Sequence, residues 1–598
     1  MYINNALDWL KRAVDSLVSH KRTDEGTGFV RSSKQIIPEQ KEGIFYTATF
    51  QAYSALLESA ETYKAEAFGL KEMTLELTHI FTPDIFAKKD QYSTNNGSRS
   101  IILLEQILKV MVYLQKYKHT IGEDIINAAK EAIDIETAKT DILSNNANDE
   151  YYYPEAGRSP WFLLSLLNCQ KYIETIYGDA NGIIKIPSVD TLIDSHINYH
   201  MARYNVKELS FDPISLVIAL CCKITRDPGF KTSPFCISCL EAIVKLQHND
   251  GCWPTGATIS FDDSGDVIQQ ASIQIASQLA EAIIDYKFLV DCNDNVEQVL
   301  DIIIPSFRKL FNYITATFEK LDNPCVYGWS SDRIKLKGYT ETWITAYTCR
   351  FLYKYWLAEK AYARIKALKR LGVTNYVYDE QNTIKEIKRW NDEIIEPDHI
   401  LKPKETIDGI IRPIIGNKEK GCLLLSPQKD NISFIICGPP GSGKTYIVKQ
   451  MAKALGWPLV ELSPSHFIKK GLDFIESTSR EIFNDLYNLH HAVVFFDECD
   501  ELFRNRSESG ETTSSRTILT ASMLPKLQDL HDKQNIIFVL GTNYLHNIDS
   551  AVRRKGRFDH RILFDRPDEE ARRLFYWAKG KSNDSDISED EFVKRTKT

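Results

Sequence analysis

The chain has 598 residues, a formal net charge of -8, 43% hydrophobic residues and 26% charged residues. This length exceeds what one hydrophobic core organises, and the ordinary composition excludes a disordered or fibrous chain, so we expect two large globular domains. The negative net charge argues against a chain whose whole surface binds nucleic acid. The 12 cysteines follow no disulfide-like spacing and the longest apolar run is too short to span a bilayer, so we expect reduced thiols and a cytoplasmic location.

Residues 1–385 carry apolar side chains at helical spacing almost throughout. Residues 100–117 and 159–173 are apolar stretches of helix length, and the loops between such stretches are rich in Asp, Asn, Gly and Pro. Strand-like alternation is scarce. We therefore predict one all-α domain over 1–385, and we expect it to recognise a protein partner.

The stretch LQHNDGCW, residues 246–253, places Gln247, Gly251 and Trp253 in the order Q-x-x-x-G-x-W. This pattern resembles the repeat of terpenoid cyclases and related helical proteins, and weaker versions of it occur at 326–352 and 26–57. The resemblance implies an (α/α) toroid, in which the glutamine ties a helix end to the neighbouring repeat and the tryptophan packs on it. It implies a structural role for these residues.

Two metal-like patterns lie in the same region. Asp262, Asp263 and Asp266 form D-D-x-x-D, which resembles the Mg²⁺–diphosphate site of class I terpene synthases, but the surrounding glycine-containing loop favours a solvated turn. A second set has zinc-like spacing, although apolar neighbours at helical spacing favour core thiols for its first two members. This set is Cys236, Cys239, His248 and Cys252.

Residues 353–372 are predicted to form a basic amphipathic helix, which could contact nucleic acid, although such a helix more often packs on a neighbour or faces solvent. The composition of the chain changes after this helix. Prolines and mixed charges over 386–430 indicate a linker and the start of a second domain. Short apolar runs then alternate with helical segments, which predicts a parallel sheet covered on both faces. The predicted strands are 432–438, 458–462, 492–498, 536–543 and 561–564. We predict an α/β subdomain over 431–565 and a short helical lid over 566–598.

A buried strand, a glycine-rich turn and a helix follow one another around the stretch GPPGSGKT, which matches the phosphate-binding pattern G-x-x-x-x-G-K-S/T. Its members are Gly438, Pro439, Pro440, Gly441, Ser442, Gly443, Lys444 and Thr445. Glycines let successive N–H groups face one anion, and the helix start adds its positive end. We predict that the loop binds ATP, that Lys444 reaches the β- and γ-phosphates, and that Thr445 ligates Mg²⁺.

Two further predicted strands end in polar residues, at the edge where an open parallel sheet binds ligands. Asp497 and Glu498 follow the apolar run AVVFF, and Asn543 ends the next strand. We predict that Asp497 completes the Mg²⁺ shell and that Glu498 accepts a proton from the attacking water. The Asn543 amide is predicted to orient that water at the γ-phosphate.

Together these segments resemble the AAA family in its narrow sense, over about residues 402–565. The residues that match the last motif of the family are Thr542, Asn543, Asp549, Ala551, Arg554, Gly556, Arg557, Phe558 and Asp559. The resemblance implies a ring, usually a hexamer, in which Arg554 and Arg557 act as arginine fingers on the nucleotide of a neighbouring subunit. Two features depart from the family. Phe467 is the candidate for the peptide-gripping aromatic, but two lysines separate its motif from Gly471, and few residues remain for the lid.

These observations predict an ATP-hydrolysing, Mg²⁺-dependent AAA machine that recognises a protein partner through its helical domain and remodels or relocates it. One alternative is a scaffold whose assembly is gated by the nucleotide and which activates a partner enzyme. The departures at the peptide-gripping loop and the lid favour that alternative. The other alternative is a toroid enzyme regulated by its ATPase, which requires a polar, acid-lined interior.

Overall fold

The computed structural model divides the chain into two compact units, which are described separately. The helical unit comprises Met1–Phe288 and Asn295–Glu359, and the sheet unit comprises Leu289–Asp294 and Lys360–Thr598. The residues described are 2–22, 28–29, 32–34, 46–60, 76–77, 98–116, 121–141, 160–177, 189–206, 213–254, 258–261, 267–269, 271–322, 325–332, 338–392, 407, 409, 411–415, 432–498, 502–503, 514–564, 569, 573, 590–591 and 594.

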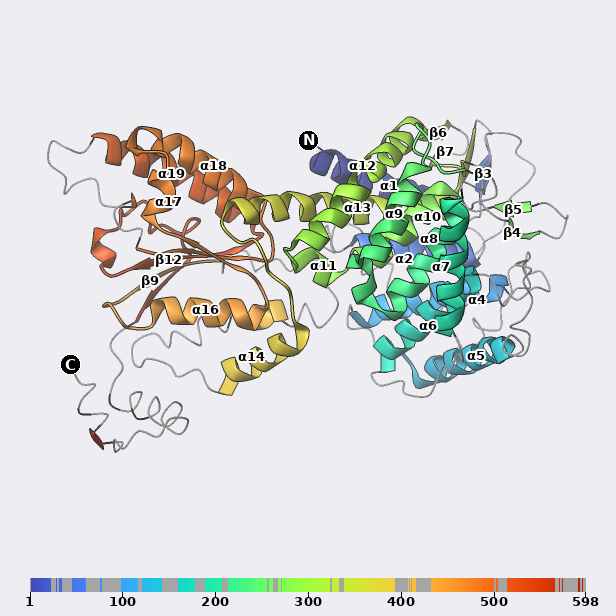
Figure 1. Cartoon of the computed structure of the whole chain (residues 1–598), viewed down its shortest axis with the longest axis horizontal. Helices are drawn as coiled ribbons and strands as arrows, with labels where there is room; N and C mark the ends of the chain where they lie inside the picture. Colours follow the sequence, from blue (N-terminus) through green and yellow to red (C-terminus); the bar gives the residue numbers. More distant parts are fainter. Residues whose placement is uncertain are drawn as a thin grey trace. The chain divides into compact units, whose positions relative to one another are not determined.

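Helices dominate the first unit, as the apolar spacing of the sequence predicts (Figure 1). They are α1 Tyr2–Ser19, α2 Tyr46–Ser59, α4 Ser98–Lys116, α5 Glu123–Asp141, α6 Pro160–Tyr177, α7 Val189–Asn205, α8 Pro213–Arg226, α9 Pro234–Lys245, α10 Ser272–Ile283, α11 Tyr286–Val290, α12 Asp294–Ala316 and α13 Thr342–Arg370, of which α11, α12 and α13 extend into the sheet unit. Short antiparallel pairs join β1 Lys21–Arg22 to β2 Gly28–Phe29, β3 Ser32–Lys34 to β8 Tyr339–Glu341, β4 Thr258–Phe261 to β5 Val267–Gln269, and β6 Glu319–Asp322 to β7 Cys325–Gly328.

Local sequence signals explain where these helices begin and what they bury. Helix α9 starts where Ser233 Oγ accepts a hydrogen bond from the Cys236 N–H at 3.1 Å, with Pro234 at the first helical position. Helix α8 is apolar on nearly every side and almost all of it is buried, as expected for a helix surrounded by others.

Alternate helices of this unit pack against one another in chain order: α2 on α4, α4 on α6, α6 on α8 and α8 on α10. Helix α13 reaches both ends of this series. Lys354 Nζ donates to the carbonyl of Ile284, just after α10, at 3.2 Å, and Cys349 Sγ lies 3.1 Å from Ser59 Oγ of α2.

The Q-x-x-x-G-x-W stretch forms a compact joint between helices. Gln247 Nε2 donates to the carbonyls of Gly251 at 2.8 Å and of Ser306, in α12, at 3.1 Å. Gly251 has φ 92, and a Cβ there would lie 2.6 Å from the Lys309 carbonyl oxygen, so only glycine fits. Trp253 is 2% exposed and donates through Nε1 to the Ile243 carbonyl at 3.0 Å. The joint therefore fixes the end of α9 against α12.

The weaker version of this pattern at 326–352 repeats the two tryptophan contacts of this joint. Trp329 Nε1 donates to the Ile314 carbonyl at 2.8 Å, as Trp253 does to Ile243. Its backbone N–H donates to Thr345 Oγ1 at 3.3 Å, in α13, as that of Trp253 donates to Ser272 Oγ at 3.0 Å, in α10. Two segments of limited sequence similarity thus make equivalent helix joints.

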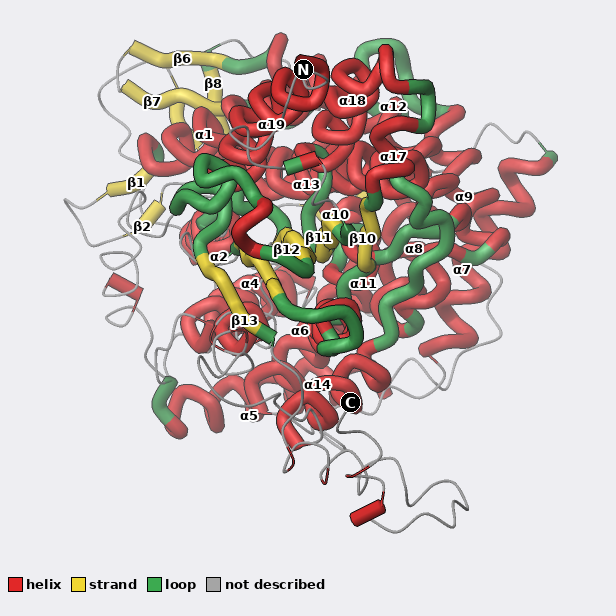
Figure 2. Tube along the Cα trace, turned by 90° about the vertical axis from the view of Figure 1, so that its left-hand side faces the viewer, coloured by secondary structure: helices red, strands yellow, loops and turns green. Residues whose placement is uncertain are grey.

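The second unit is built on a parallel sheet of five strands in the order β10-β11-β12-β9-β13. The strands are β9 Ser433–Cys437, β10 Leu459–Leu462, β11 Val493–Phe496, β12 Ile537–Thr542 and β13 His560–Leu563. Strands β10, β11 and β12 lie side by side in Figure 2, with β13 at the opposite edge. Helix α16 Lys444–Leu455 covers one face, and α18 Ile475–Tyr487 and α19 Ser514–Lys533 cover the other (Figure 1). The alternation of apolar runs and helices in the sequence therefore predicts this α/β module.

Residues 360–392, including helix α14 Glu380–Asp392, pack within the sheet unit. The fully buried Arg364 donates to the carbonyls of His490 at 2.7 Å and of His491 and Asp291 at 3.3 Å each. The contacts divide the chain between 359 and 360, whereas the change in composition lies near 385. The composition around Arg364 does not reveal its hydrogen bonds to distant residues, so the boundary at 359 could not be predicted from composition.

Candidate functional site

The glycine-rich turn lies between the fully buried strand β9 and helix α16. A Cβ at Gly438 would lie 1.9 Å from the Phe564 carbonyl oxygen, so this position accepts glycine alone. Gly441 and Gly443 have φ values of 79 and 90, in the left-handed region, and a Cβ at either would face open space. These conformations curl the backbone as a phosphate-binding loop requires.

Lys444 begins helix α16 and turns its ammonium group back over the loop. Its Nζ donates to the carbonyls of Gly438 at 2.7 Å and Pro439 at 3.0 Å, and to Asn543 Oδ1 at 2.9 Å. The structure therefore brings together two residues that lie 99 positions apart in the sequence, one at the start of α16 and one directly after β12. Their contact joins the cation of the loop to the amide at the sheet edge.

Asp497 and Glu498 follow strand β11, next to the start of α16. Thr445 Oγ1 donates to Asp497 Oδ2 at 3.4 Å, and the Asp497 N–H donates to the Leu462 carbonyl at 2.8 Å. Burial and then the neighbouring Glu498 raise the pKa of Asp497. A carboxylate held in such surroundings favours a bound cation.

Glu498 differs from its neighbour in both conformation and exposure. Its backbone has φ 54, in the left-handed region that non-glycine residues rarely adopt, and its side chain is exposed. Strain of this kind clusters at functional sites. The conformation separates the two carboxylates, with Asp497 toward Thr445 and Glu498 toward solvent.

Strand β12 brings Asn543 to the same edge and requires a glycine two residues before it. A Cβ at Gly541 would lie 2.9 Å from the Phe495 ring and 3.3 Å from Asp497 Oδ1. The parallel register places Phe496 beside both Leu462 and Leu540, so β10 and β11 end together, and β12 continues to Thr542, which pairs with the last residue of β9. The carboxyl edge of the sheet thus assembles the loop, the acidic pair and the amide in one place.

The surroundings of the Ser442 hydroxyl show whether this site fits a nucleotide. Its hydroxyl is buried inside the loop and has no hydrogen-bond partner among the described residues. A buried unpaired hydroxyl is unfavourable, and a phosphate oxygen would satisfy it. With the Lys444 ammonium and the Thr445–Asp497 pair beside it, the donor set fits a nucleotide phosphate and a hard divalent cation.

The two predicted finger residues have different surroundings. Arg557 is half-buried, and its Nη1 donates to the Ala551 carbonyl at 2.6 Å. Arg554 is exposed, and its side chain makes no hydrogen bond or ion pair with any described residue. Arg557 therefore stabilises its own turn, while Arg554 is free to contact another molecule.

Comparison with known proteins agrees with this geometry. Residues 434–566 match the family described as "ATPase family associated with various cellular activities (AAA)". The C-terminal region of this chain is an AAA ATPase domain. It hydrolyses ATP and uses ATP and Mg²⁺ as cofactors.

Three relatives illustrate the similarity of this AAA domain to known ATPases. "ATP-dependent zinc metalloprotease FtsH 3" of Synechocystis is 33% identical over 165 residues, which is 27% of either chain. "AAA ATPase forming ring-shaped complexes" of Rothia mucilaginosa is 36% identical over 162 residues, 24% of this chain and 26% of that protein. Human "ATPase family AAA domain-containing protein 2" is 34% identical over 143 residues, 23% of this chain and 10% of that protein. The chain thus spans about a quarter or less of the length of these three relatives.

One candidate residue within the AAA domain does not have the exposure that its role would require. Phe467, the candidate peptide-gripping aromatic, is 0% exposed within α17 Pro464–Ile468, because its ring belongs to the core. The exposed apolar side chains of this segment are instead Ile468 and Phe474. The lid expected over 566–598 lies almost entirely outside the described residues.

The metal-like patterns of the helical unit find no support in the described residues. Asp262, Asp263 and Asp266 lie outside them. No group of three or more potential ligands that could hold a metal occurs in the parts of the chain that are described. Burial raises the pKa values of Cys236 and Cys239 to about 12, as expected for core thiols.

Two further findings bear on the other predicted partners. Much of the basic segment 353–372 is buried, including Lys354 and Arg364, so these cations are not available to nucleic acid. No helix in the described ranges is both long and apolar enough to cross a membrane.

The structure also gives roles to residues that motif matching leaves unexplained. Asp559, at the start of β13, accepts hydrogen bonds from Ser433 Oγ at 2.9 Å and His531 Nε2 at 2.9 Å. It thereby ties the starts of β9 and β13 to the end of α19. Its place in the family motif is the only sequence signal for this role, which is structural because it lies at the edge of the sheet opposite the phosphate loop.

Proposed function

We propose that the chain is an ATP-driven ring machine whose helical unit recognises a protein partner, which ATP turnover remodels or relocates. The observation that carries the proposal is the convergence of the phosphate loop, the acidic pair and Asn543 at one sheet edge, with Arg554 exposed nearby in sequence. This combination provides a complete pocket on one subunit and a free cation for the next.

The roles within the pocket follow from position. The loop N–H groups, Ser442 and Lys444 hold the phosphates, and Thr445 and Asp497 hold Mg²⁺, which when bound neutralises charge on the phosphates. Glu498 accepts the proton of the attacking water, and its exposed carboxylate stands apart from the metal-binding Asp497. Asn543, already hydrogen-bonded to Lys444, orients the water.

The ring is supported by two facts: a relative is described as forming ring-shaped complexes, and the exposed Arg554 side chain has no hydrogen-bond or ion-pair partner among the described residues. We propose a hexamer in which Arg554 of one subunit completes the pocket of its neighbour, with Arg557 holding the turn that presents it. Cyclic association of identical chains places the same two surfaces together at every interface.

The experiment is to trap the machine with ATP bound. Glu498→Gln removes the proton acceptor but keeps the shape, so turnover falls by about 10²–10⁴-fold while ATP stays bound. Affinity purification of this variant with ATP should retain the partner protein. Lys444→Ala, which should lose nucleotide binding, is the matched control and should retain none. If the two variants bind nucleotide equally and turn it over at the wild-type rate, the assignment of the site is wrong.

A second function, a nucleotide-gated scaffold, is favoured by the burial of Phe467, since a ring without this aromatic lacks the usual means of pulling a peptide. In a scaffold, the ring assembles with ATP bound and does not assemble with ADP bound. In a remodeller, the partner accelerates hydrolysis. Measuring turnover with and without the trapped partner, together with ring size in ATP and in ADP, separates the two.

We further propose that the helical unit is an (α/α) toroid. Support comes from the alternate helices that pack in chain order, from α13 contacting both α2 and the end of α10, and from the two equivalent tryptophan joints. A toroid would give the partner a rigid end face made of loops, where recognition usually occurs.

A further inference from the structure

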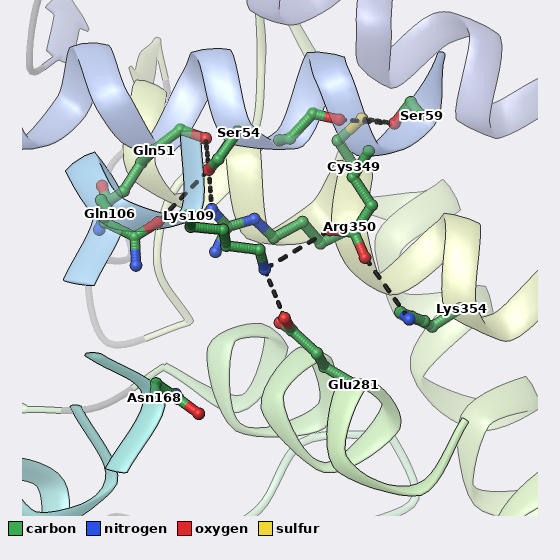
Figure 3. Close-up of polar contacts among 12 residues, drawn as sticks. Gln51, Ser54, Ser59, Gln106, Lys109, Asn168, Glu281, Cys349, Arg350 and Lys354 are labelled. Atoms are coloured by element: carbon green, nitrogen blue, oxygen red, sulfur yellow. Dashed lines mark hydrogen bonds and ion pairs between the residues drawn. The ribbon is translucent and has the colours of Figure 1, made fainter. Parts of the chain in front are cut away.

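Charged side chains gather inside the helical unit, where α2, α4, α10 and α13 meet (Figure 3). We call these residues the interior cluster: Glu58, Lys109, Glu281, Arg350 and Lys354, with the amides Gln51 and Gln106 beside them. Buried charges are unfavourable unless each is paired. The pairing within the cluster therefore decides what the cluster can do.

Four members of the interior cluster neutralise one another. Lys109 Nζ lies 2.5 Å from Glu281 Oε1 and 3.6 Å from Glu58 Oε2, and Lys354 Nζ lies 3.5 Å from Glu58 Oε1. Desolvation opposes ionisation of Glu281, but Lys109, Arg350 and Lys354 outweigh it and lower its pKa to about 2. Two ammonium groups thus face two carboxylates, and these four charges cancel.

Arg350 is the surplus cation of the interior cluster. It is 3% exposed, yet its hydrogen bonds go only to neutral groups, Ser54 Oγ and Gln106 Oε1, the latter at 2.6 Å. Its Nε has no hydrogen-bond partner among the described residues, and Glu281 and Glu58 act on its charge without forming an ion pair or hydrogen bond with it there. A guanidinium offers five donors in a planar fork suited to carboxylate and phosphate, so its buried, incompletely used fork favours an oxyanion.

One more acid, Glu105, borders the interior cluster, but its hydrogen bonds go to residues other than Arg350. Glu105 of α4 accepts hydrogen bonds from Ser165 Oγ at 2.7 Å and Asn168 Nδ2 at 2.8 Å, both in α6. Burial raises its pKa, and the hydrogen bonds from Ser165 and Asn168 act in the opposite direction. Its hydrogen bonds direct it toward α6, so it does not pair with the guanidinium.

An unsatisfied amide and a partly exposed carboxylate belong to the interior cluster. Gln51 is 5% exposed, and its Oε1 has no hydrogen-bond partner among the described residues. Glu281, the partner of Lys109, nevertheless keeps 32% of its side chain exposed. The cluster thus continues from a buried arginine to an accessible carboxylate on α10.

We propose that the interior cluster is a binding site for a small hydroxylated organic oxyanion, whose carboxylate or phosphate pairs with Arg350 and whose hydroxyl group donates to Gln51 Oε1. The site is separate from the nucleotide pocket, because all of its residues belong to the helical unit. The proposed role of the interior cluster is to bind the oxyanion, without a chemical reaction.

The test uses the full-length chain with saturating ADP and Mg²⁺, so that the phosphate loop is filled. Glucose 6-phosphate, inorganic phosphate, gluconate and uncharged glucose are titrated by calorimetry, which separates a phosphate ligand from a carboxylate ligand. At least one of the three anions should bind, and glucose should not. Arg350→Gln should weaken that binding by about 10- to 100-fold, the usual loss for a charged hydrogen bond.

Two further variants keep a structural role distinguishable from a binding role. Gln51→Leu should weaken anion binding without lowering the unfolding temperature of the chain free of anion, since its Oε1 has no internal partner to lose. Arg226→Gln, at an exposed arginine of the same unit that pairs with Asp190 at 2.9 Å, should bind like wild type. The proposal is overturned if none of the anions binds, or if Arg350→Gln and Arg226→Gln bind them equally well.

Discussion

Replacing Arg554 by alanine isolates the contact between subunits, because this side chain is exposed and makes no hydrogen bond or ion pair with the described residues of its own chain. Its loss should change the free energy of unfolding by no more than about 0.5 kcal/mol, as for other surface substitutions. Turnover, in contrast, should fall by about 10³–10⁵-fold, the contribution of an arginine that neutralises charge in the transition state. Lys555→Ala, at the exposed neighbouring residue, should keep wild-type turnover.

Mixing two inactive variants tests whether the arginine acts on another subunit. Arg554→Ala retains an intact pocket, and Lys444→Ala retains an intact arginine. In an equal random mixture, about one interface in four pairs the two, so turnover should recover to about a quarter of wild type if interfaces act independently. A chain that carries both substitutions has neither an intact pocket nor an intact arginine, so it should stay inactive. Phosphate release measures the rates, and a mixture as inactive as its components would refute the action between subunits.

Three other substitutions test the loop, the helix joint and the interior cluster. Gly438→Ala should weaken the binding of a fluorescent ADP and destabilise the sheet unit by about 1–3 kcal/mol, because its Cβ would lie 1.9 Å from the Phe564 carbonyl oxygen; unchanged ADP affinity would contradict this. Trp253→Ala should lower the free energy of unfolding in urea by about 3–5 kcal/mol, and the half-buried Trp343→Ala by clearly less; equal losses would remove the special role of the joint. The depressed pKa of Glu281 predicts stability that is fully present above about pH 4.3 and is lost as pH falls toward about 2, so Glu281→Gln should flatten the acid side of the stability profile, and a profile as steep as wild type would argue against the ion pair.

The sequence predicts local features of this protein well. The phosphate loop requires glycines, a lysine and a threonine at fixed spacing, because a few consecutive residues form the whole cradle. The acidic pair and Asn543 are predictable because parallel strands end at one edge. Gln247 and Trp253 are likewise recognisable, since their partners lie within one helix joint and, for Gln247, in the adjoining helix α12.

Features that depend on distant segments are decided only by the tertiary structure. Phe467 occupies the position of a surface aromatic in the motif, yet neighbouring segments bury it in the core. Lys109 and Glu105 are visible as charges within the apolar segment 100–117, but nothing in that segment shows that α10 and α13 supply Glu281 and Arg350. A side chain's chemistry and its neighbours along a helix are local properties, whereas burial, ion pairing and the pKa of a group depend on which segments pack around it, and that is fixed only when the chain has folded.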